Sequence, residues 1–557
     1  MKKIQINISA RLNKLNVAVI LSLLFVTAAF AITSETSSHP GWWAILPPII
    51  AIGLALTFKE VIISLLMGVF VGSLILNPTS PAKAFMDIPS VFVWDALADK
   101  GHAAIVLFSL MLGGMVGIIS KSGGTAAIVR LFGRLTSSRR GGMLMTYLLG
   151  LVIFFDDYAN TLLVGNTMRP YTDRLKISRA KLAYIVDSTA APVTSIAVIS
   201  TWVGFEVGLL RDATASFPGI GDAYVLFLKA IPYHFYSILA LFLVFILIMS
   251  GRDFGPMKEV ELETQEGNDA SKSQDFSELH DENKSDRSNT SALIAVIPIF
   301  LVIIATFIGL YVNGLRQSPP GSKMFEIIGQ ADSSTVLLNS SFIGLISSGL
   351  FAGFMSRMSI GDISKAMIDG IKSMIPAFVI LILAWSIGDV CARLGTAEVI
   401  INAVSGKLPP FLLPVVIFLI AAVVAFSTGT SWGTMAILIP IAIPLAFQLP
   451  LQEGIAANQA NHILLGSIGA VLAGATFGDH CSPISDTTIL SSMASGCDHV
   501  AHVRTQIPYA LTAGMVAIII GYLPAGLGLP GWIGLLLGVV ALLLIMVLLK
   551  YRKRTGE

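Results

Sequence analysis

Apolar stretches long enough to cross a lipid bilayer recur along the whole chain. Of the 557 residues, 54% are hydrophobic and only 13% are charged, and the mean hydropathy is +0.79. A transmembrane helix needs about 20 mainly apolar residues, and only helices and closed barrels satisfy their backbone polar groups in hydrocarbon. The composition predicts an all-α polytopic membrane protein with about 11–13 spans. These spans are expected near residues 42–58, 61–76, 103–120, 142–168, 182–209, 225–250, 291–313, 336–356, 373–389, 410–448, 462–494, 506–524 and 531–549.

The apolar runs form two sets separated by a polar segment. Residues 251–290 carry eleven acidic and five basic side chains and few large apolar ones, a composition typical of disordered linkers. The predicted organisation is a first membrane repeat over 42–250, this cytoplasmic linker, a second repeat over 291–549 and a basic cytoplasmic tail over 550–557. Residues 1–33 fit either a secretory signal, with Ala29-Phe30-Ala31 as its cleavage site, or an uncleaved first transmembrane helix.

Lysine and arginine residues orient the spans, because short loops rich in them stay in the cytoplasm. Arg139 and Arg140 precede one interrupted apolar run, and five basic residues follow it between Arg169 and Lys181, so both of its ends are expected inside. The segment 450–461, which follows the run over 410–448, contains neither lysine nor arginine. That second hairpin is therefore expected to open outward, and the basic tail places the C-terminus inside.

Acidic residues interrupt the apolar runs in two places, Phe154–Thr161 and Thr476–Thr488. A carboxylate at membrane depth costs roughly 2.5–3.5 kcal/mol, so polar partners must accompany it. Pro192, Pro483, Gly429 and Gly478 are expected to break the helices at or near these places. The acidic residues within apolar runs are Asp156, Asp157, Asp187, Asp479 and Asp486.

Short matches in the same order along both halves indicate an internal repeat. Ala191-Pro-Val-Thr-Ser195 resembles Ser482-Pro-Ile-Ser-Asp486, and Ile231-Pro-Tyr233 recurs as Ile507-Pro-Tyr509. Because the two interrupted hairpins are expected to open in opposite directions, the repeat is predicted to be inverted. Inverted repeats with interrupted helices at the midplane are typical of secondary transporters.

Oxygen-bearing side chains gather around the interruptions. Carboxylate, hydroxyl and carbonyl oxygens suit a hard cation such as sodium, and a buried carboxyl can instead take up a proton. Competition of the two ions for one carboxylate is the simplest exchange mechanism. The predicted ion-binding residues are Asp156, Asp157, Asn160, Thr161, Asp187, Ser427, Thr428, Thr430, Ser431, Asp479, His480, Ser485, Asp486 and Thr487.

Other classes of protein fit the sequence less well. His480-Cys481 and the later His499 and His502 lack four-ligand zinc spacing, so neither a transition metal nor another cofactor is expected, and His480 is interpreted as a hydrogen-bond partner or proton relay for Asp479. The signature of an intramembrane aspartyl protease is not met at Asp479, and no repeated pore loop indicates a channel. No basic patch interleaved with aromatic residues predicts nucleic-acid binding.

The string Gly478-Asp-His-Cys-Ser-Pro-Ile-Ser-Asp-Thr-Thr-Ile-Leu-Ser-Ser492, with Gly429-Thr-Ser-Trp-Gly433 and Phe154-Phe-Asp-Asp-Tyr158, resembles the NhaC family of bacterial sodium/proton antiporters. The likeness covers most of the chain from about residue 40. It implies a secondary transporter in the bacterial cytoplasmic membrane that exchanges sodium for protons. The family also includes exchangers of organic acids such as malate and lactate, so coupled exchange of a small organic acid or an amino acid stays open. A homodimer is a further possibility, because dimers are common among transporters of this design.

Overall fold

The computed structural model describes residues 41–552, apart from 59, 126, 128–137, 216, 218–219, 268–290, 323, 325–326, 328–330 and 484. The regular elements in this part of the chain are all helices, which agrees with the all-α expectation. The first set comprises η2 (Gly41–Ile45), α2 (Leu46–Phe58), α3 (Val61–Leu76), α4 (Pro81–Asp87), η3 (Ile88–Val93), α5 (Trp94–Ala98), α6 (Lys100–Lys121), α8 (Arg139–Val152), α9 (Asp157–Arg174), α10 (Arg179–Ser188), α11 (Ala191–Thr194), α12 (Thr201–Thr214), α13 (Ala223–Ala230), η4 (Ile231–Tyr233), α14 (Phe235–Ser250) and α15 (Pro256–Glu266).

The second set follows after residue 290. It comprises α16 (Leu293–Gln317), α18 (Ser333–Ser356), α19 (Ile360–Ser373), α20 (Ile375–Leu394), α21 (Thr396–Val404), η5 (Pro410–Leu412), α22 (Leu413–Thr428), α23 (Ser431–Gln452), α24 (Ala457–Cys481), α25 (Asp486–Ser495), α26 (His499–Val516), η6 (Ala517–Tyr522), α27 (Leu523–Gly526) and α28 (Gly531–Arg552).

Eight helices in the described part are long and apolar enough to cross a membrane, and the count rises to nine if one bent pair, Ala223–Tyr233 with Phe235–Ser250, is a single span. The expected 11–13 spans exceed this number. The difference arises because the sequence estimate also counted shorter apolar helices, such as Val61–Leu76, and runs that the structure divides into short helices. The protein is a multi-pass, all-helical membrane protein.

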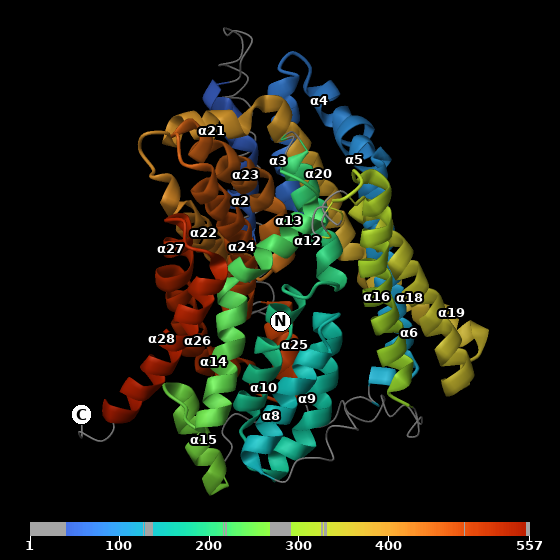
Figure 1. Ribbon diagram of the computed structural model, residues 1–557, viewed down its shortest axis with the longest axis vertical. Coiled ribbons are helices and arrows are strands. Elements are labelled where there is room, and N and C mark those ends of the chain that lie inside the picture. The colour runs from blue at the N-terminus through green and yellow to red at the C-terminus, as the bar shows by residue number, and fades with distance from the viewer. Residues whose placement is uncertain are drawn as a thin grey trace, which may run out of the picture.

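The interrupted runs become two hairpins and two broken helices. Helices α8 and α9 form the first hairpin, with its tip at residues 153–156, and α22 and α23 form the second, with its tip at Gly429 and Thr430. Figure 1 shows α8 and α9 in the lower half of the molecule and α22 and α23 in the upper half. The successive helices α10, α11 and α12 form one broken helix, and α24 with α25 forms the other.

A close helix crossing holds the second hairpin against the broken helix α24. A Cβ atom added to Gly474 would lie 2.8 Å from the Phe418 carbonyl oxygen, and one added to Gly478 would lie 2.4 Å from that of Ala422. Gly478 was expected to permit a non-helical backbone. It lies within α24, so it acts by allowing α22 to approach, which is the common role of small residues between membrane helices.

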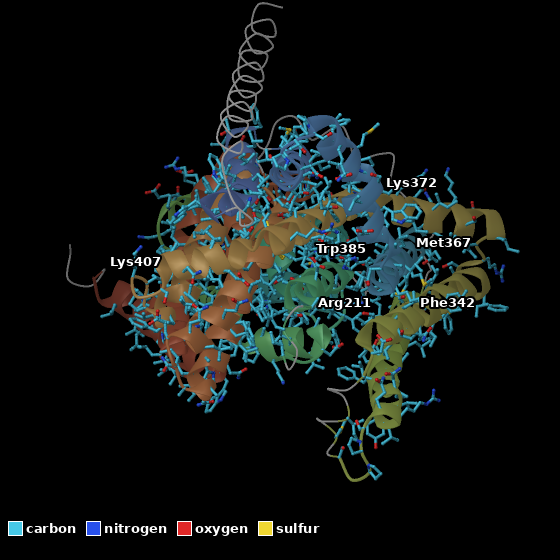
Figure 2. All side chains as sticks on the ribbon, turned by 90° about the horizontal axis from the view of Figure 1, so that it is seen from above. Arg211, Phe342, Met367, Lys372, Trp385 and Lys407 are labelled. Atoms are coloured by element: carbon cyan, nitrogen blue, oxygen red, sulfur yellow. The ribbon has the colours of Figure 1, made fainter. Side chains whose placement is uncertain are left out.

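Glycine also joins a group of helices at one side of the molecule. Added Cβ atoms on Gly117 and Gly370 would come within 2.4 Å of the Ala366 oxygen and 2.2 Å of the Gly113 oxygen, so α6 and α19 cross with their backbones in contact. Helices α16, α18 and α19 stand beside the rest of the molecule in Figure 1, and Figure 2 shows Phe342, Met367 and Lys372 on that side. The described helices that carry the polar breaks lie outside this group.

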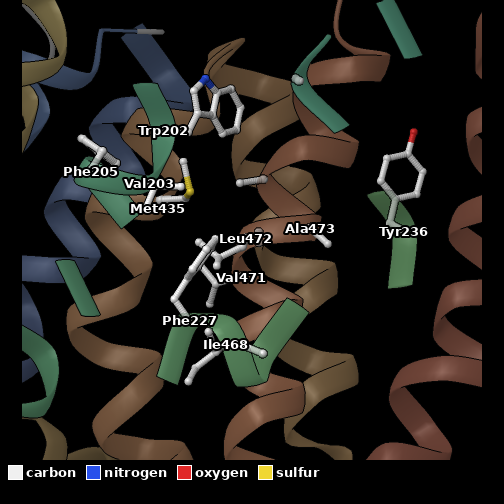
Figure 3. Close-up of a cluster of buried hydrophobic side chains, with 14 of the residues drawn as sticks. Trp202, Val203, Phe205, Phe227, Tyr236, Met435, Ile468, Val471, Leu472 and Ala473 are labelled. Carbon is white, nitrogen blue, oxygen red and sulfur yellow. The ribbon is translucent and has the colours of Figure 1, made fainter. Parts of the chain in front are cut away.

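The centre of the molecule is a tightly packed apolar core. Trp202, Val203 and Phe205 of α12 lie near Met435 of α23 and Leu472 of α24, as Figure 3 shows. Trp202 and Val203 are almost completely buried. Trp202 also lies beside Asp157, so this core adjoins the tip of the first hairpin.

The first part of the predicted linker is helical. Helix α15 spans Pro256–Glu266, and its Glu261 is only 4% exposed, accepting a hydrogen bond from the Ser178 amide at 2.7 Å and pairing with Arg139. The expectation of a structureless segment over 251–290 is therefore wrong for α15, because one buried acidic side chain anchors this polar helix to the first hairpin. Residues 268–290, the segment 1–33 and the end of the tail at 553–557 lie outside the described residues.

The two Ile-Pro-Tyr matches occupy different structures. Ile231–Tyr233 forms the short turn η4 between α13 and α14, which are bent by 45° at this point. Pro508 instead lies inside α26, which continues through it. The repeated sequence marks corresponding places in the chain without imposing the same backbone.

Candidate ion-binding site

Helix α9 begins at the tip of the first hairpin and presents three polar side chains on one face. Asp157, Asn160 and Thr161 have the helical spacing i, i+3, i+4, and none is more than 1% exposed. The Asn160 amide nitrogen lies 2.7 Å from the Gly150 oxygen and 3.1 Å from the Ile153 oxygen, and it also contacts the Thr189 oxygen at 2.8 Å. The amide therefore holds the hairpin tip to the break after α10, leaving its own oxygen to face elsewhere.

Several buried oxygens at this tip accept no well-aligned hydrogen bond from the described residues. We call them the oxygen cluster: both carboxylate oxygens of Asp157, Oδ1 of Asn160, and Oγ1 of Thr161 and Thr201. Thr201 belongs to this region because its amide donates to the Phe155 oxygen at 3.0 Å. Buried acceptors without a donor are rare in folded proteins, so several at one hairpin tip indicate a place built for a positively charged partner.

A second cluster surrounds Asp479, which is 2% exposed near the end of α24. Its Oδ2 accepts hydrogen bonds from Ser431 at 2.8 Å and Thr487 at 3.4 Å, and its Oδ1 accepts one from Ser485 at 2.6 Å. Ser431 begins α23, so the tip of the second hairpin and the α24–α25 break both bind the same carboxylate. We call this set the Asp479 cluster.

The two clusters adjoin each other. The carboxyl groups of Asp156, Asp479 and Asp486 are all close enough to Asp157 to interact with it electrostatically, and the Trp202 indole lies beside the same carboxylate. The Tyr158 hydroxyl next to Asp157 also donates to Asp486 Oδ2. Polar groups from both halves of the chain thus meet at the hairpin tips, with Asp486 on the exposed side.

Asp187, at the end of α10, has a different environment from Asp157. It accepts hydrogen bonds from Gln506 at 2.7 Å, Ser491 at 3.1 Å and Thr488 at 3.2 Å, and it is 1% exposed. The sequence left open a pair between Asp187 and Lys181. Lys181 instead binds Asp253 at 2.5 Å.

His480 does not hydrogen-bond to the neighbouring Asp479, contrary to its interpretation as that residue's partner. Its Nε2 lies 3.1 Å from Ser188 Oγ and its Nδ1 lies 2.6 Å from Tyr236 Oη. Its ring points back toward α10 and α14 because successive helical residues point in different directions. The nearby carboxylate is that of Asp187, at 4.0 Å from Nε2.

The remaining predicted residues shape the tip of the second hairpin or lie at the two helix breaks. The Thr428 hydroxyl donates to the Val424 oxygen at 2.8 Å, while Thr430 caps α23 by accepting from the Gly433 amide at 3.4 Å. Gly429 between them has φ = +72°, a left-handed conformation that favours glycine. Ser427 is half-buried beside this turn, and Pro192 and Pro483 lie at the two breaks, within α11 and before α25.

Sequence reasoning missed several polar residues in and around the site. Gln506 and His502 lie four residues apart on one face of α26, a spacing that could have identified them. Glu206 lies in the apolar stretch of α12 and met the criterion applied to the aspartates; it is completely buried and neither carboxylate oxygen has a donor in the described part. Thr201 carries no sequence signal, and Tyr158 stands in the Phe154–Tyr158 motif without being named as a site residue; only folding brings Thr201 to the oxygen cluster and Tyr158 to Asp486.

Positive side chains do not neutralise the carboxylates of the two clusters. Within the described ranges, no lysine or arginine is hydrogen-bonded or ion-paired to Asp157, Asp187 or Asp479. The polar centre therefore consists of oxygens, two histidines and amides. Such a centre suits small cations better than anions.

Opposed hairpins, broken helices and a polar centre inside an all-helical membrane domain define a secondary transporter; the protein is a transporter and not an enzyme. Residues 193–527 match the sequence profile of the Na+/H+ antiporter family. An uncharacterized protein of Haemophilus influenzae is 34% identical over 96% of this chain and 100% of its own length. The chain belongs to the Na+/H+ antiporter family, which confirms the resemblance to the NhaC type.

Relatives with named activities match a shorter part of the chain. The Na(+)/H(+) antiporter NhaC of Alkalihalophilus pseudofirmus is 29% identical over 32% of this chain and 37% of its own. The malate-2H(+)/Na(+)-lactate antiporter of Bacillus subtilis is 28% identical over 31% of this chain and 34% of its own. The solved structure of the YdaH transporter of Alcanivorax borkumensis superposes on this protein with a TM-score of 0.53 at 15% identity, over 81% of this chain and 90% of the YdaH chain. This is a likeness of fold alone.

Proposed function

We propose that this transporter exchanges sodium for protons across the bacterial cytoplasmic membrane, with its C-terminus in the cytoplasm. The observation that carries the proposal is the oxygen cluster, whose carboxylate, amide and hydroxyl oxygens are buried without a well-aligned hydrogen bond in the described part. Oxygen ligands of this kind suit a hard monovalent cation. An unpaired carboxylate inside a membrane protein is costly, so Asp157 carries either sodium or a proton at all times.

The Asp479 cluster completes the substrate site in this proposal. Ser431, Ser485 and Thr487 hold the Asp479 carboxylate, and their hydroxyl oxygens retain lone pairs that can face a cation. Sodium bound between Asp157 and Asp479 would draw the two hairpin tips together. Protonation of the same carboxyls would release it, so the two ions compete for one site.

Coupled exchange of an organic acid is the second candidate. Helix α23 begins inside the molecule at Ser431, after the half-buried Thr430, and the N-terminus of a helix attracts a carboxylate. The activity of the Bacillus subtilis relative, a malate-2H(+)/Na(+)-lactate antiporter, is consistent with this use of the site. Among the described residues, no lysine or arginine pairs with Asp157, Asp187 or Asp479, which favours the simpler exchange of two cations.

Purified protein in proteoliposomes distinguishes the two candidates. A sodium gradient alone should drive proton movement, read with a pH-sensitive dye, and malate, lactate or amino acids should not be needed. Asp157→Asn should abolish this signal, since an amide can neither bind the proton nor balance the sodium charge. Asp389→Asn is the matched control, because Asp389 binds Arg393 on α20 at 2.7 Å, away from the clusters. A proton signal that appears only with an organic solute would replace the first candidate by the second.

A further inference from the structure

A chain of hydrogen-bonding side chains connects one end of the molecule with buried Asp187. His499 Nδ1 lies 3.0 Å from Ser492 Oγ, and the same hydroxyl lies 2.8 Å from His502 Nδ1. On its other side, His502 Nε2 lies 3.9 Å from Asp187 Oδ2. Neither imidazole was among the residues predicted to bind an ion.

This series of hydrogen-bonding side chains starts at His499, at the end of the molecule where Arg179 lies. His499 is half-buried at the start of α26, directly after exposed Asp498. The preceding turn is bound by Arg179, whose guanidinium donates to the Ser495 and Gly496 oxygens at 3.2 Å. Because arginine-rich ends are cytoplasmic, His499 lies where cytoplasmic protons can reach it.

Counting hydrogens shows that these side chains hold at least one exchangeable proton. His499 Nε2 faces the Pro483 oxygen at 2.7 Å and His502 Nε2 faces Gln506 Oε1 at 2.8 Å, so both Nε2 atoms carry hydrogen. The Gln506 orientation is fixed because its nitrogen contacts two acceptors, Asp187 Oδ2 and the His480 oxygen. Three acceptors then surround Ser492 Oγ, namely the two Nδ1 atoms and the Thr488 oxygen at 2.8 Å, but Ser492 has one hydroxyl hydrogen. At least one ring must be protonated for both histidine contacts to be hydrogen bonds, and both rings must be when the hydroxyl donates to the Thr488 oxygen.

We propose that His499, Ser492 and His502 form a proton relay between the cytoplasm and Asp187. A proton on His499 Nδ1 passes to Ser492 Oγ while the hydroxyl hydrogen passes to His502 Nδ1, which leaves His499 neutral and makes His502 an imidazolium. His502 then gives its Nε2 proton to the Asp187 carboxylate, forming a neutral carboxylic acid. A half-turn of the His502 ring restores its first tautomer.

Asp187 connects this relay with the sodium site. Thr488 Oγ1 lies 3.2 Å from Asp187 Oδ2 and 3.3 Å from the Asp479 backbone oxygen, so protonation of Asp187 acts on the helix end that carries Asp479. Gln506 and Ser491 hold Asp187 in reach of His502 and are positioning residues. The relay rests on the proposed sodium/proton exchange, for which it supplies the cytoplasmic proton route.

Further titratable groups lie on α26 and on the elements packed against it. They are Tyr184 and Lys181 on α10, Tyr236 on α14, Glu261 on α15, Asp479, His480 and Cys481 on α24, Asp486 on α25, and Arg504 and Tyr509 on α26.

Removal of the central hydroxyl tests the relay in proteoliposomes. Ser492→Ala should slow sodium-driven proton flux by about tenfold or more, while proton-independent exchange of sodium for labelled sodium stays at the wild-type rate. Ser492→Thr, which keeps the hydroxyl, should restore proton flux. Ser495→Ala is the matched control on the same helix, because the Ser495 hydroxyl is buried without a partner in the described part.

A second variant tests the entrance without disturbing the core. His499→Ala should lose proton flux, and imidazole buffer on the cytoplasmic side should restore it, which a merely structural role would not produce. Wild-type proton flux in both Ser492→Ala and His499→Ala would overturn the relay, as would parallel loss of both exchange modes without rescue by imidazole. Absence of sodium-driven proton flux in the wild type would instead overturn the proposed function.

Discussion

At the scale of single residues, Glu206 is a buried carboxyl that stores unfavourable free energy. Neither of its oxygens has a donor among the described residues, and replacing an unpaired polar group by an apolar one of similar shape is neutral or stabilising. We expect Glu206→Met to raise the free energy of unfolding by about 1–3 kcal/mol, seen as a higher melting temperature in detergent. A lower melting temperature would mean that Glu206 has a stabilising partner.

Gly429 is a residue whose backbone, rather than its side chain, matters. Its φ of +72° lies in the left-handed region, where a Cβ atom costs roughly 1–2 kcal/mol. Gly429→Ala should lower the free energy of unfolding by about this amount and weaken sodium-driven exchange, because the tip also presents Ser431. Gly53→Ala provides the control, since a Cβ there meets nothing within 4 Å; equal losses in both variants would remove the conformational explanation.

At the scale of helices, the crossing of α22 and α24 should tolerate little added volume. Gly478→Ala places a methyl group 2.4 Å from the Ala422 oxygen, and overpacking of this kind typically costs about 1–3 kcal/mol. Gly466→Ala on the same helix should cost less, because its nearest atom is a Pro414 side-chain carbon at 3.3 Å. Thermal unfolding of the two variants in detergent compares them, and the reverse order of stability would contradict this crossing.

At the scale of the whole molecule, the opposed hairpins should open to opposite sides of the membrane. In an Arg174→Cys variant, the new cysteine at the end of the first hairpin should react with a membrane-impermeant maleimide only from the cytoplasmic side. In an Asn458→Cys variant, the new cysteine after the second hairpin should react with the same maleimide only from outside. Background labelling should be low because Cys391, Cys481 and Cys497 are buried, and labelling of both new positions from one side would rule out the inverted arrangement.

Much of the fold could be predicted because membrane helices are recognisable in a sequence by their length and apolar composition. The breaks near Asp157, Gly429 and Pro483 were also predictable, since acidic residues, glycine and proline oppose a continuous helix in hydrocarbon. The predicted number of spans exceeded the eight or nine found in the described part, because periodicity does not show which apolar helices are too short to cross the membrane. Helix α15 was missed because the sequence does not show that a buried Glu261 anchors this polar helix.

The sequence by itself determined that this chain crosses a membrane many times and carries carboxylates at membrane depth, because hydropathy is a local property of each segment. Only the tertiary structure decided which acceptors have donors. Asp479 and Asp187 are well supplied with hydroxyl and amide donors, whereas in the described part the donor beside Asp157 is the Trp202 indole, which makes no well-aligned hydrogen bond with it. This distinction depends on side chains that lie up to hundreds of residues apart in the sequence, and so does the contact of His502 with Asp187. Helix packing, and not the local sequence, brings such side chains together.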